Sequence, residues 1–192
     1  TVAMGHLDVA QERTDDEQLD EVERSLRRID NLIDDLLTLA RQGESVGETE
    51  AVALDAVARD ARETADTPEA AIEIGDPPTV QADESRLRKL FENLFRNAVD
   101  HGPDDVTVRV GGLDDRQGFY VEDDGPGIPE DEREQVFEQG HTTSPDGTGF
   151  GLAIVEQVAD AHGWTITLGE SETGGARIEN GVDAEPSASQ TS

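Results

Sequence analysis

The chain has 192 residues, with 45 aspartates and glutamates against 15 lysines and arginines, a formal net charge of −30 and no cysteine. This length accommodates one compact domain and a smaller appendage. The charge excludes nucleic acid and anionic membrane surfaces as expected partners, and the lack of cysteine excludes disulfides and thiolate metal sites.

Residues 1–42 are predicted to form a helical hairpin. Between residues 19 and 40, apolar side chains recur at steps of three and four, which indicates a long helix with a narrow apolar stripe. The stripe consists of Leu19, Val22, Leu26, Ile29, Ile33, Leu36 and Ala40. Residues 2–13 have a shorter helical pattern, and residues 14–16 supply the turn. Two such arms are half of a four-helix bundle, so we expect a second copy of the chain to complete it.

A larger domain is predicted over residues 51–180, after a polar, glycine-bearing linker at 43–50. Its pattern predicts an α+β sandwich, in which helices cover one face of a sheet. The expected elements are a helix at 55–65, strands at 71–74 and 79–82, a helix at 84–101 with Asp83 as N-cap, strands at 106–111 and 118–123, a helix at 149–162, and strands at 164–168 and 175–179. Residues 181–192 have little apolar content and are predicted to be a disordered tail.

The predicted helix at 84–101 carries two asparagines. Its apolar residues define a buried face, and Asn93 and Asn97, four positions apart, share a second face. Neutral amide oxygens one turn apart suit a Mg²⁺ ion that takes its charge from phosphate oxygens. A solvated helix face has the same pattern, so the pair alone leaves both interpretations open.

Two glycine-rich segments follow. Residues 123–129 (DDGPGIP) come after a predicted strand, and the aspartate can accept a hydrogen bond from an exocyclic amino group such as that of adenine. Residues 147–152 (GTGFGL) open a predicted helix, where free backbone N–H groups and the helix dipole favour phosphate. Either segment alone is also consistent with an ordinary loop. Both segments after the asparagine helix indicate a nucleotide site.

In this order the segments resemble the conserved boxes of sensor histidine kinases. Residues 93–101 resemble the N box, 123–129 the first glycine box, 136–138 the F box and 147–152 the second glycine box. Residues 161–163 and 174–176 are similar to that family's closing motifs, and the hairpin is similar to its dimerisation and phosphoacceptor domain. The resemblance covers nearly all of residues 1–180 and implies a Bergerat-type ATP-binding fold.

The resemblance also implies a role for each matching residue. Asn93 and Asn97 would hold Mg²⁺ and the phosphates, and Asp123 would bind the adenine amino group. The second glycine box would form a mobile lid over the triphosphate, and Gly125 and Gly127 would shape the adenine pocket. The full set of implied ATP contacts is Asn93, Asn97, His101, Asp123, Gly125, Gly127, Thr142, Thr143, Gly147, Thr148, Gly149, Gly151 and Leu152.

One position departs from the family's pattern. The residue before His101 is frequently lysine in the family and is Asp100 here. Arg96 could supply the missing cation, because it neighbours the asparagine face, or it could be a solvated arginine.

Residue 93 bears on the expected reaction. Relatives that hydrolyse ATP, such as gyrase-type topoisomerases and mismatch-repair ATPases, carry a glutamate four residues before the magnesium asparagine, as do the anti-sigma-factor serine kinases. That carboxylate is a general base, whereas the Asn93 amide cannot take a proton. Glu92 is adjacent but points about 100° away on a helix. The resemblance therefore favours a protein-histidine kinase of a two-component system, which transfers the γ-phosphoryl of ATP to a histidine and then to a response-regulator aspartate.

No catalytic residue is expected within the chain itself. The family's acceptor motif, a histidine followed by an acidic residue, arginine and proline, is absent, and His6 is interpreted as a bundle residue. We therefore expect the acceptor upstream of Thr1 and regard the chain as a truncated kinase that cannot phosphorylate itself. His141 and His162 are interpreted as structural, the latter as a cation at a helix C-terminus. The alternatives are a non-catalytic module that binds nucleotide and dimerises, or an ATP-hydrolysing relative.

The expected partners are a second copy of the chain, through the hairpin, and the receiver domain of a response regulator. No apolar run approaches the ~20 residues of a membrane span, so no membrane contact is expected. We expect a cytoplasmic protein or the cytoplasmic part of a membrane-anchored sensor. Lysine occurs once, at Lys89, against 14 arginines. This composition resembles proteins of salt-loving archaea, where the Debye length near molar salt is about 3 Å; an ordinary acidic protein is the alternative.

Overall fold

The computed structural model describes residues 17–40, 49–65, 70–115, 117–142 and 147–182. Several predictions lie outside these residues. They are the first arm of the hairpin and its turn, most of the linker, Thr143, and the tail from residue 183 onward.

The described helices and strands follow the predicted order, with β1 and η1 as additions. Within residues 51–180, each expected element has a counterpart whose ends differ by at most two residues from the prediction. The elements are α2 (Glu17–Ala40), β1 (Glu50–Ala53), α3 (Leu54–Thr64), β2 (Ala71–Ile74), β3 (Thr79–Ala82), α4 (Glu84–His101), β4 (Thr107–Gly112), β5 (Gly118–Asp123), η1 (Gln135–Phe137), α5 (Gly151–His162), β6 (Thr165–Glu170) and β7 (Ala176–Gly181).

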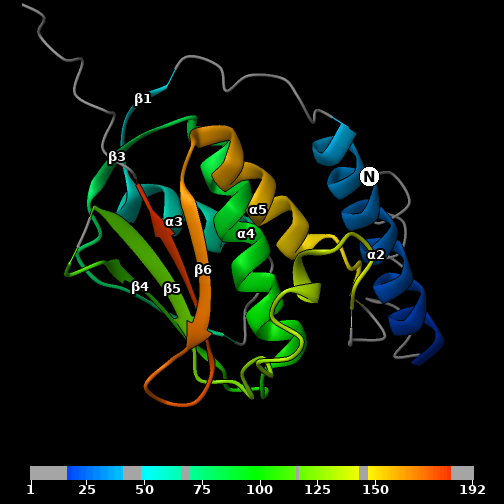
Figure 1. Cartoon of the computed structure of the whole chain (residues 1–192). Helices are drawn as coiled ribbons and strands as arrows, with labels where there is room; N and C mark the ends of the chain where they lie inside the picture. The colour runs from blue at the N-terminus through cyan, green and yellow to red at the C-terminus, as the bar shows by residue number, and fades with distance from the viewer. Residues whose placement is uncertain (1–16, 41–48, 66–69, 116, 143–146, 183–192) are drawn as a thin grey trace, which may run out of the picture.

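A five-stranded sheet in the order β2-β4-β5-β7-β6 forms one layer of the domain. β2 and β4 run parallel, whereas the other neighbouring strands run antiparallel. Helices α3, α4 and α5 lie together beside this sheet (Figure 1). The predicted α+β class is therefore confirmed. None of the described helices combines the length and the apolar character that crossing a membrane requires.

The strand β1 was not predicted. It pairs antiparallel with β3 outside the main sheet, so that buried Val52 lies opposite buried Val80. The last residue of the linker predicted at 43–50, Glu50, is therefore the first residue of a strand. Likewise, the first residue of the tail predicted at 181–192, Gly181, is the last residue of β7. A four-residue strand with one buried side chain has no periodicity to detect in the sequence.

The core between sheet and helices is centred on aromatic rings. Phe91 of α4 packs against Phe119 of β5, with 5.5 Å between ring centroids, and against Phe95 at 5.8 Å. Phe119 in turn meets the edge of Trp164 at 5.8 Å. The three phenylalanines are fully buried. Because aromatic side chains bury large apolar areas, these contacts fix α4 across the sheet.

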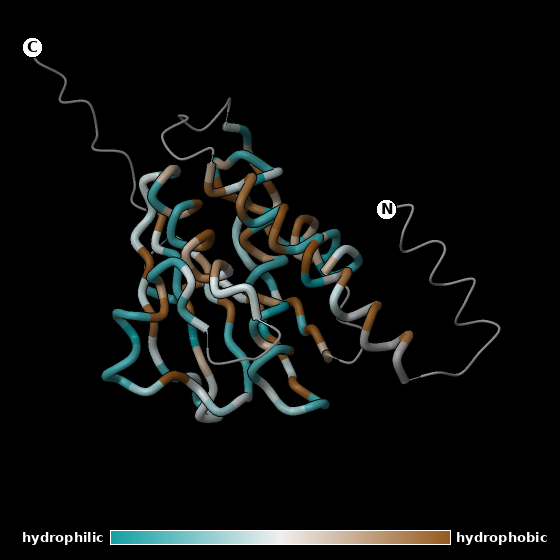
Figure 2. Tube along the Cα trace, turned by 90° about the vertical axis from the view of Figure 1, so that its right-hand side faces the viewer, coloured by the Kyte–Doolittle hydropathy of each residue, from teal (hydrophilic) through white to brown (hydrophobic). Residues whose placement is uncertain are grey.

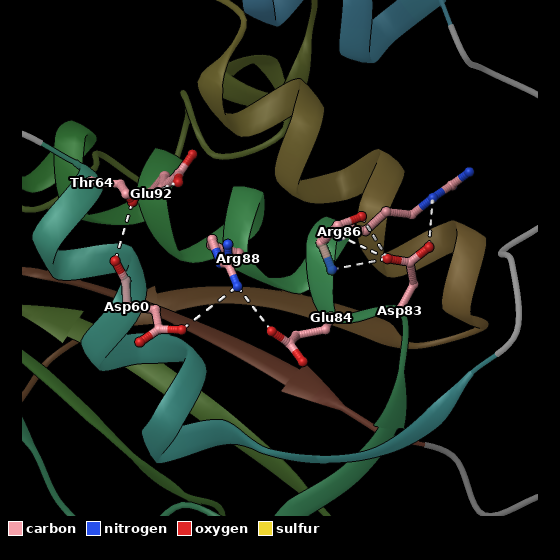
Figure 3. Close-up of polar contacts among 8 residues, drawn as sticks. Asp60, Thr64, Asp83, Glu84, Arg86, Arg88 and Glu92 are labelled. Atoms are coloured by element: carbon pink, nitrogen blue, oxygen red, sulfur yellow. Dashed lines mark hydrogen bonds and ion pairs between the residues drawn. The ribbon is translucent and has the colours of Figure 1, made fainter.

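Local polar contacts hold α4 at its start and along its α3 side (Figure 3). Asp83 is the predicted N-cap, and its Oδ1 accepts hydrogen bonds from the backbone N–H groups of Ser85 and Arg86. Arg88 lies between Glu84 on its own helix and Asp60 of α3, at N···O distances of 2.9 and 3.6 Å.

Helix α2 lies beside α5, apart from the sheet (Figure 1). It turns Asp35 and Leu39 toward the domain, where both are buried. Most of the predicted apolar stripe faces elsewhere, and Figure 2 shows hydrophobic positions recurring along the helix. Its large apolar side chains that remain about half exposed are Val22, Ile29, Ile33, Leu36 and Leu37. One arm of the hairpin is thus a helix with an uncovered apolar face, and the hairpin itself stays a prediction.

His162 ends α5, as expected, but its charge differs from the prediction. Its Nε2 accepts a hydrogen bond from the backbone N–H of Asp83 at 3.0 Å, and its Nδ1 lies 2.7 Å from the Val158 carbonyl oxygen, to which it donates. The ring also stacks on Trp164, with 4.5 Å between centroids. An imidazole that accepts at one nitrogen and donates at the other is neutral. Burial lowers the pKa of His162, so the predicted cation at this helix end is wrong.

We predict that His162 makes the fold less stable in mild acid. In the unfolded chain a histidine binds a proton below about pH 6.5, whereas the folded imidazole resists protonation until lower pH. Its stabilising effect is therefore complete above about pH 6.5 and is lost as the pH falls below it. Urea unfolding of the wild type and of His162→Gln between pH 7.5 and 5.5 should give a shallower pH dependence for the variant. Equal slopes for the two proteins would contradict the neutral imidazole.

Candidate functional site

A cleft of about 270 Å³ opens at one end of α4, beside the carboxyl end of β5. Its apolar floor is formed by side chains of the sheet, from Val108, Val121 and Ile178, and of α4, from Leu94 and Ala98. The segments after β5 and before α5 form the remaining walls. The strand residues of the floor come from β4, β5 and β7, which are neighbours in the sheet, although β7 is distant from the other two in sequence.

The cleft brings together nearly all the predicted site residues. Those that line it are Asn93, Asn97, His101, Asp123, Gly127, Thr142, Gly147, Thr148, Gly149, Gly151 and Leu152. Thr143 lies outside the described residues. Gly125 is the exception among the described ones, because it lies behind Asp123 rather than on the wall, and its backbone N–H donates to Asp123 Oδ1 at 2.9 Å.

The two asparagines differ in environment. The side chain of Asn93 is 1% exposed, and its Nδ2 donates to the Lys89 carbonyl oxygen at 2.8 Å. Asn93 therefore lies on the buried side of α4, whereas the sequence pattern placed it on a separate face. The Nδ2 of Asn97 is buried and has no hydrogen-bond partner among the described residues. A buried amide of this kind at the edge of a cleft suits a polar ligand.

Asn97 also faces the start of α5. A Cβ atom at Gly151 would lie 2.8 Å from Asn97 Oδ1, so only glycine allows the first turn of α5 to approach the amide this closely. Among the described residues, no side chain caps this helix N-terminus. The first backbone N–H groups of a helix have no partner within the helix, so those of α5 lie beside Asn97 and suit an anion such as phosphate.

Asp123 is held in place by backbone groups. Its Oδ1 accepts hydrogen bonds from the N–H groups of Gly125 and Ala176, at 2.9 and 3.1 Å. The Oγ of Ser171 donates to the Asp123 carbonyl oxygen at 2.8 Å. A side chain at Gly175 would collide with that same carbonyl. The segment 174–176 thus serves the site indirectly, by fixing Asp123.

Burial raises the pKa of the Asp123 carboxyl, although the hydrogen bonds from Gly125 and Ala176 act in the opposite direction. Both of these backbone donors bind Oδ1. A proton would therefore reside on Oδ2 and turn this oxygen from an acceptor into a donor. Only the ionised carboxylate can accept a hydrogen bond there from an amino group.

Three polar residues near the site were also considered from the sequence, namely Asp100, Arg96 and Glu92. Asp100 lines the cleft, so an acidic group does occupy the position that is frequently lysine in the family. Arg96 is absent from the lining, and the structure does not support it as the replacement cation. Glu92 faces α3, where it accepts a hydrogen bond from Thr64 Oγ1 at 2.8 Å, so its exclusion as a general base is consistent with the structure.

Sequence reasoning missed the apolar part of the site. Val108, Val121 and Ile178 were predicted only as strand residues, and nothing in their local pattern separates a pocket floor from ordinary core. Ile128 and Glu132 also line the cleft. His141, interpreted as structural, lies on the wall, and its Nε2 is buried without a hydrogen-bond partner among the described residues.

Comparisons with known proteins show which sequences and folds this chain is similar to. The sequence profile of the family described as histidine kinase-, DNA gyrase B-, and HSP90-like ATPase matches residues 82–186. The chain is 37% identical over 185 residues to the sensor-type histidine kinase PrrB of Mycobacterium leprae (strain TN), covering 90% of this chain and 40% of that protein. It is 38% identical over 105 residues to the sensor histidine kinase ZraS of Escherichia coli O157:H7, covering 53% and 22%. The chain spans less than half the length of these relatives.

Solved structures with the same fold include the mycobacterial sensor histidine kinase MprB. This chain superposes on it with a TM-score of 0.59 and 29% identity, over 68% of this chain and 95% of that chain. Full-length ShkA, solved in complex with AMPPNP, gives a TM-score of 0.64 and 30% identity, over 86% of this chain and 38% of that chain.

We predict that adenosine binding weakens in mild acid through Asp123. An ordinary aspartate has a pKa of about 3.9. Because the pKa of Asp123 is raised, this carboxyl takes up a proton at a higher pH than an ordinary aspartate does. Calorimetric titrations with adenosine, which carries no titrating phosphate, should show affinity falling as the pH drops from 7 toward 4.5. Asp123→Asn should bind weakly at every pH, with no such dependence. A wild-type affinity that stays constant over this range would refute the assignment.

Proposed function

Because the chain belongs to the family of histidine kinase-, DNA gyrase B- and HSP90-like ATPases, we propose that it binds Mg-ATP in the cleft as the catalytic part of a sensor histidine kinase. The observation that carries this proposal is that Asp123 and Asn97 both line one cleft with an apolar floor. Asp123 would select the adenine amino group, and the floor would contact the planar base.

The phosphates would lie between Asn97 and the start of α5. The uncapped N–H groups of that helix are donors for phosphate oxygens. The amide oxygens of Asn93 and Asn97 would hold Mg²⁺, which when bound neutralises phosphate charge. The unpaired Asn97 Nδ2 supports a polar ligand at this point. These groups position ATP and stabilise negative charge, which is most of what phosphoryl transfer requires of a protein.

The reaction would be transfer of the γ-phosphoryl group of ATP to a histidine outside this chain, with ADP as the other product, and then to an aspartate of a response regulator. A histidine nitrogen is already a nucleophile, so no general base is needed from α4. The buried amide of Asn93 cannot serve as one.

The domain division and the partners belong to the same proposal. Residues 1–42 would form the hairpin, 43–50 the linker and 51–180 the ATP-binding domain. The half-exposed apolar face of α2 supports burial against a second copy of the chain in a four-helix bundle. The acidic, lysine-poor composition supports a salt-loving archaeal source.

Asn97→Asp tests the nucleotide site directly. A carboxylate at this position would face the triphosphate and repel it, so ATP affinity in the presence of Mg²⁺ should fall at least about tenfold, which corresponds to roughly 1.4 kcal/mol. Isothermal titration calorimetry measures the change. Gln81→Glu adds the same single negative charge at an exposed position outside the cleft and should bind like the wild type. Undiminished ATP affinity in Asn97→Asp would show that Asn97 does not lie at the phosphates of ATP.

A second measurement separates the kinase from an ATP-hydrolysing relative. Because residue 93 is an amide and Glu92 faces α3, the chain with Mg-ATP should release almost no inorganic phosphate over hours. A phosphate-release assay in which the enzyme-free rate is subtracted provides the readout. Sustained turnover that disappears in Asn97→Asp would support hydrolysis instead.

A further inference from the structure

Helix α2 makes direct polar contacts with the second glycine box. Thr148 Oγ1 donates to Asp35 Oδ2 at 2.8 Å, and Arg28 Nη2 donates to the Gly147 carbonyl oxygen at 3.3 Å. A third contact, from Gln157 Nε2 to the Thr38 carbonyl oxygen at 3.5 Å, joins α2 to α5 itself. Thr148 and Gly147 both line the cleft. The position of α2 is therefore linked to the part of the cleft expected to hold phosphate.

Asp35 is the most unusual residue of this contact. Its side chain is 0% exposed, and its Oδ1 has no hydrogen-bond partner among the described residues. Lys89 Nζ lies 3.8 Å from Oδ1, and this ammonium also lies 3.9 Å from Glu92 Oε2. A buried carboxylate with one hydrogen bond and a shared, distant cation is poorly compensated for its lost hydration. It adds little stability to the docked arrangement of α2.

The hydroxyl of Thr148 has a single proton to donate. In the structure that proton goes to Asp35, and the Thr148 oxygen lies 3.4 Å from the Phe150 N–H as an acceptor. The phosphate oxygens of ATP are mostly deprotonated at neutral pH, so they mainly accept hydrogen bonds. While Thr148 donates its hydrogen bond to Asp35, it cannot donate one to a phosphate. In addition, the negative charge of the buried Asp35 carboxylate beside the loop repels an anion in the cleft.

We propose that Asp35 is a positioning residue that couples α2 to the second glycine box and lowers the affinity of the cleft for phosphate while α2 is docked. Undocking of α2 would return the Thr148 hydroxyl to the cleft and remove the nearby negative charge. By thermodynamic reciprocity, ATP binding would weaken the docking of α2 by the same factor. The inference rests on the proposed function, since it places the phosphates of ATP against this loop.

The test compares ATP with adenosine, which lacks phosphate. In the full chain, Asp35→Ala should bind ATP about three- to tenfold more tightly than the wild type, as expected for one recovered hydrogen bond, and should bind adenosine unchanged. Asp35→Asn keeps an acceptor for Thr148 and should give a smaller gain. Asp34→Ala, which removes the same charge from the exposed neighbouring position, should leave both affinities at wild-type values.

A double-mutant cycle identifies Thr148 as the intermediary. In the Thr148→Val background, which has no hydroxyl to release, Asp35→Ala should lose most of its effect on ATP, whereas in Thr148→Ser the effect should persist. Unchanged or weaker ATP binding in both Asp35 variants would overturn the proposal, as would equal shifts for ATP and adenosine, which indicate general loosening. If the wild type binds neither ATP nor adenosine, both the proposed function and the coupling are wrong. If the wild type binds ATP and the Asp35 variants bind it with the same affinity, only the coupling is wrong.

Discussion

The packing of Phe91 on Phe119 determines the geometry of the site. It fixes the rotation of α4 about its own axis, because both rings are fully buried and leave no room for another orientation. Asn97 follows Phe91 by six residues on the helix, and Asp123 follows Phe119 by four on the strand. A rotation of α4 by one residue, about 100°, would carry the asparagines away from the cleft.

A second constraint acts on Asp123. Asp123 has both its carboxylate and its carbonyl group tied to the segment that leads into β7, through Ala176 and Ser171. Glycine at position 175 is required because any side chain there would meet the Asp123 carbonyl. The cleft is therefore built from two rigid supports, a helix anchored by aromatic packing and an aspartate anchored by backbone hydrogen bonds. Rigid supports of this kind are what precise positioning of a ligand requires.

The sequence predicted most of the fold because most elements have strong local signals. The apolar pattern of α4 and the Asp83 cap, for example, gave both ends of that helix correctly. The motif residues were also brought together as expected, since each glycine cluster follows or precedes an element that positions it. The recognisable features were those encoded within a few residues of one another.

What the sequence did not predict depends on contacts between distant segments. The strand β1 exists because β3 lies beside it, and the neutral state of His162 follows from a backbone N–H of Asp83. Gly125 supports Asp123 instead of lining the wall, which depends on the path of the turn. The docking of α2 through Asp35 has no local pattern either, because an aspartate on a charged helix is indistinguishable from its solvated neighbours.

The pairing of Trp164 with His162 gives the molecule a single optical probe. Trp164 is the only tryptophan of the chain, it is buried, and its indole stacks on an imidazole that is neutral in the native state. Tryptophan emission, excited at wavelengths where tyrosine does not absorb, therefore comes from one place, the end of α5 away from Gly151. The same helix begins at Gly151 beside Asn97. The fluorescence of Trp164 therefore reports whether a conformational change at the start of α5 extends to the end of the helix or is confined to its first turn.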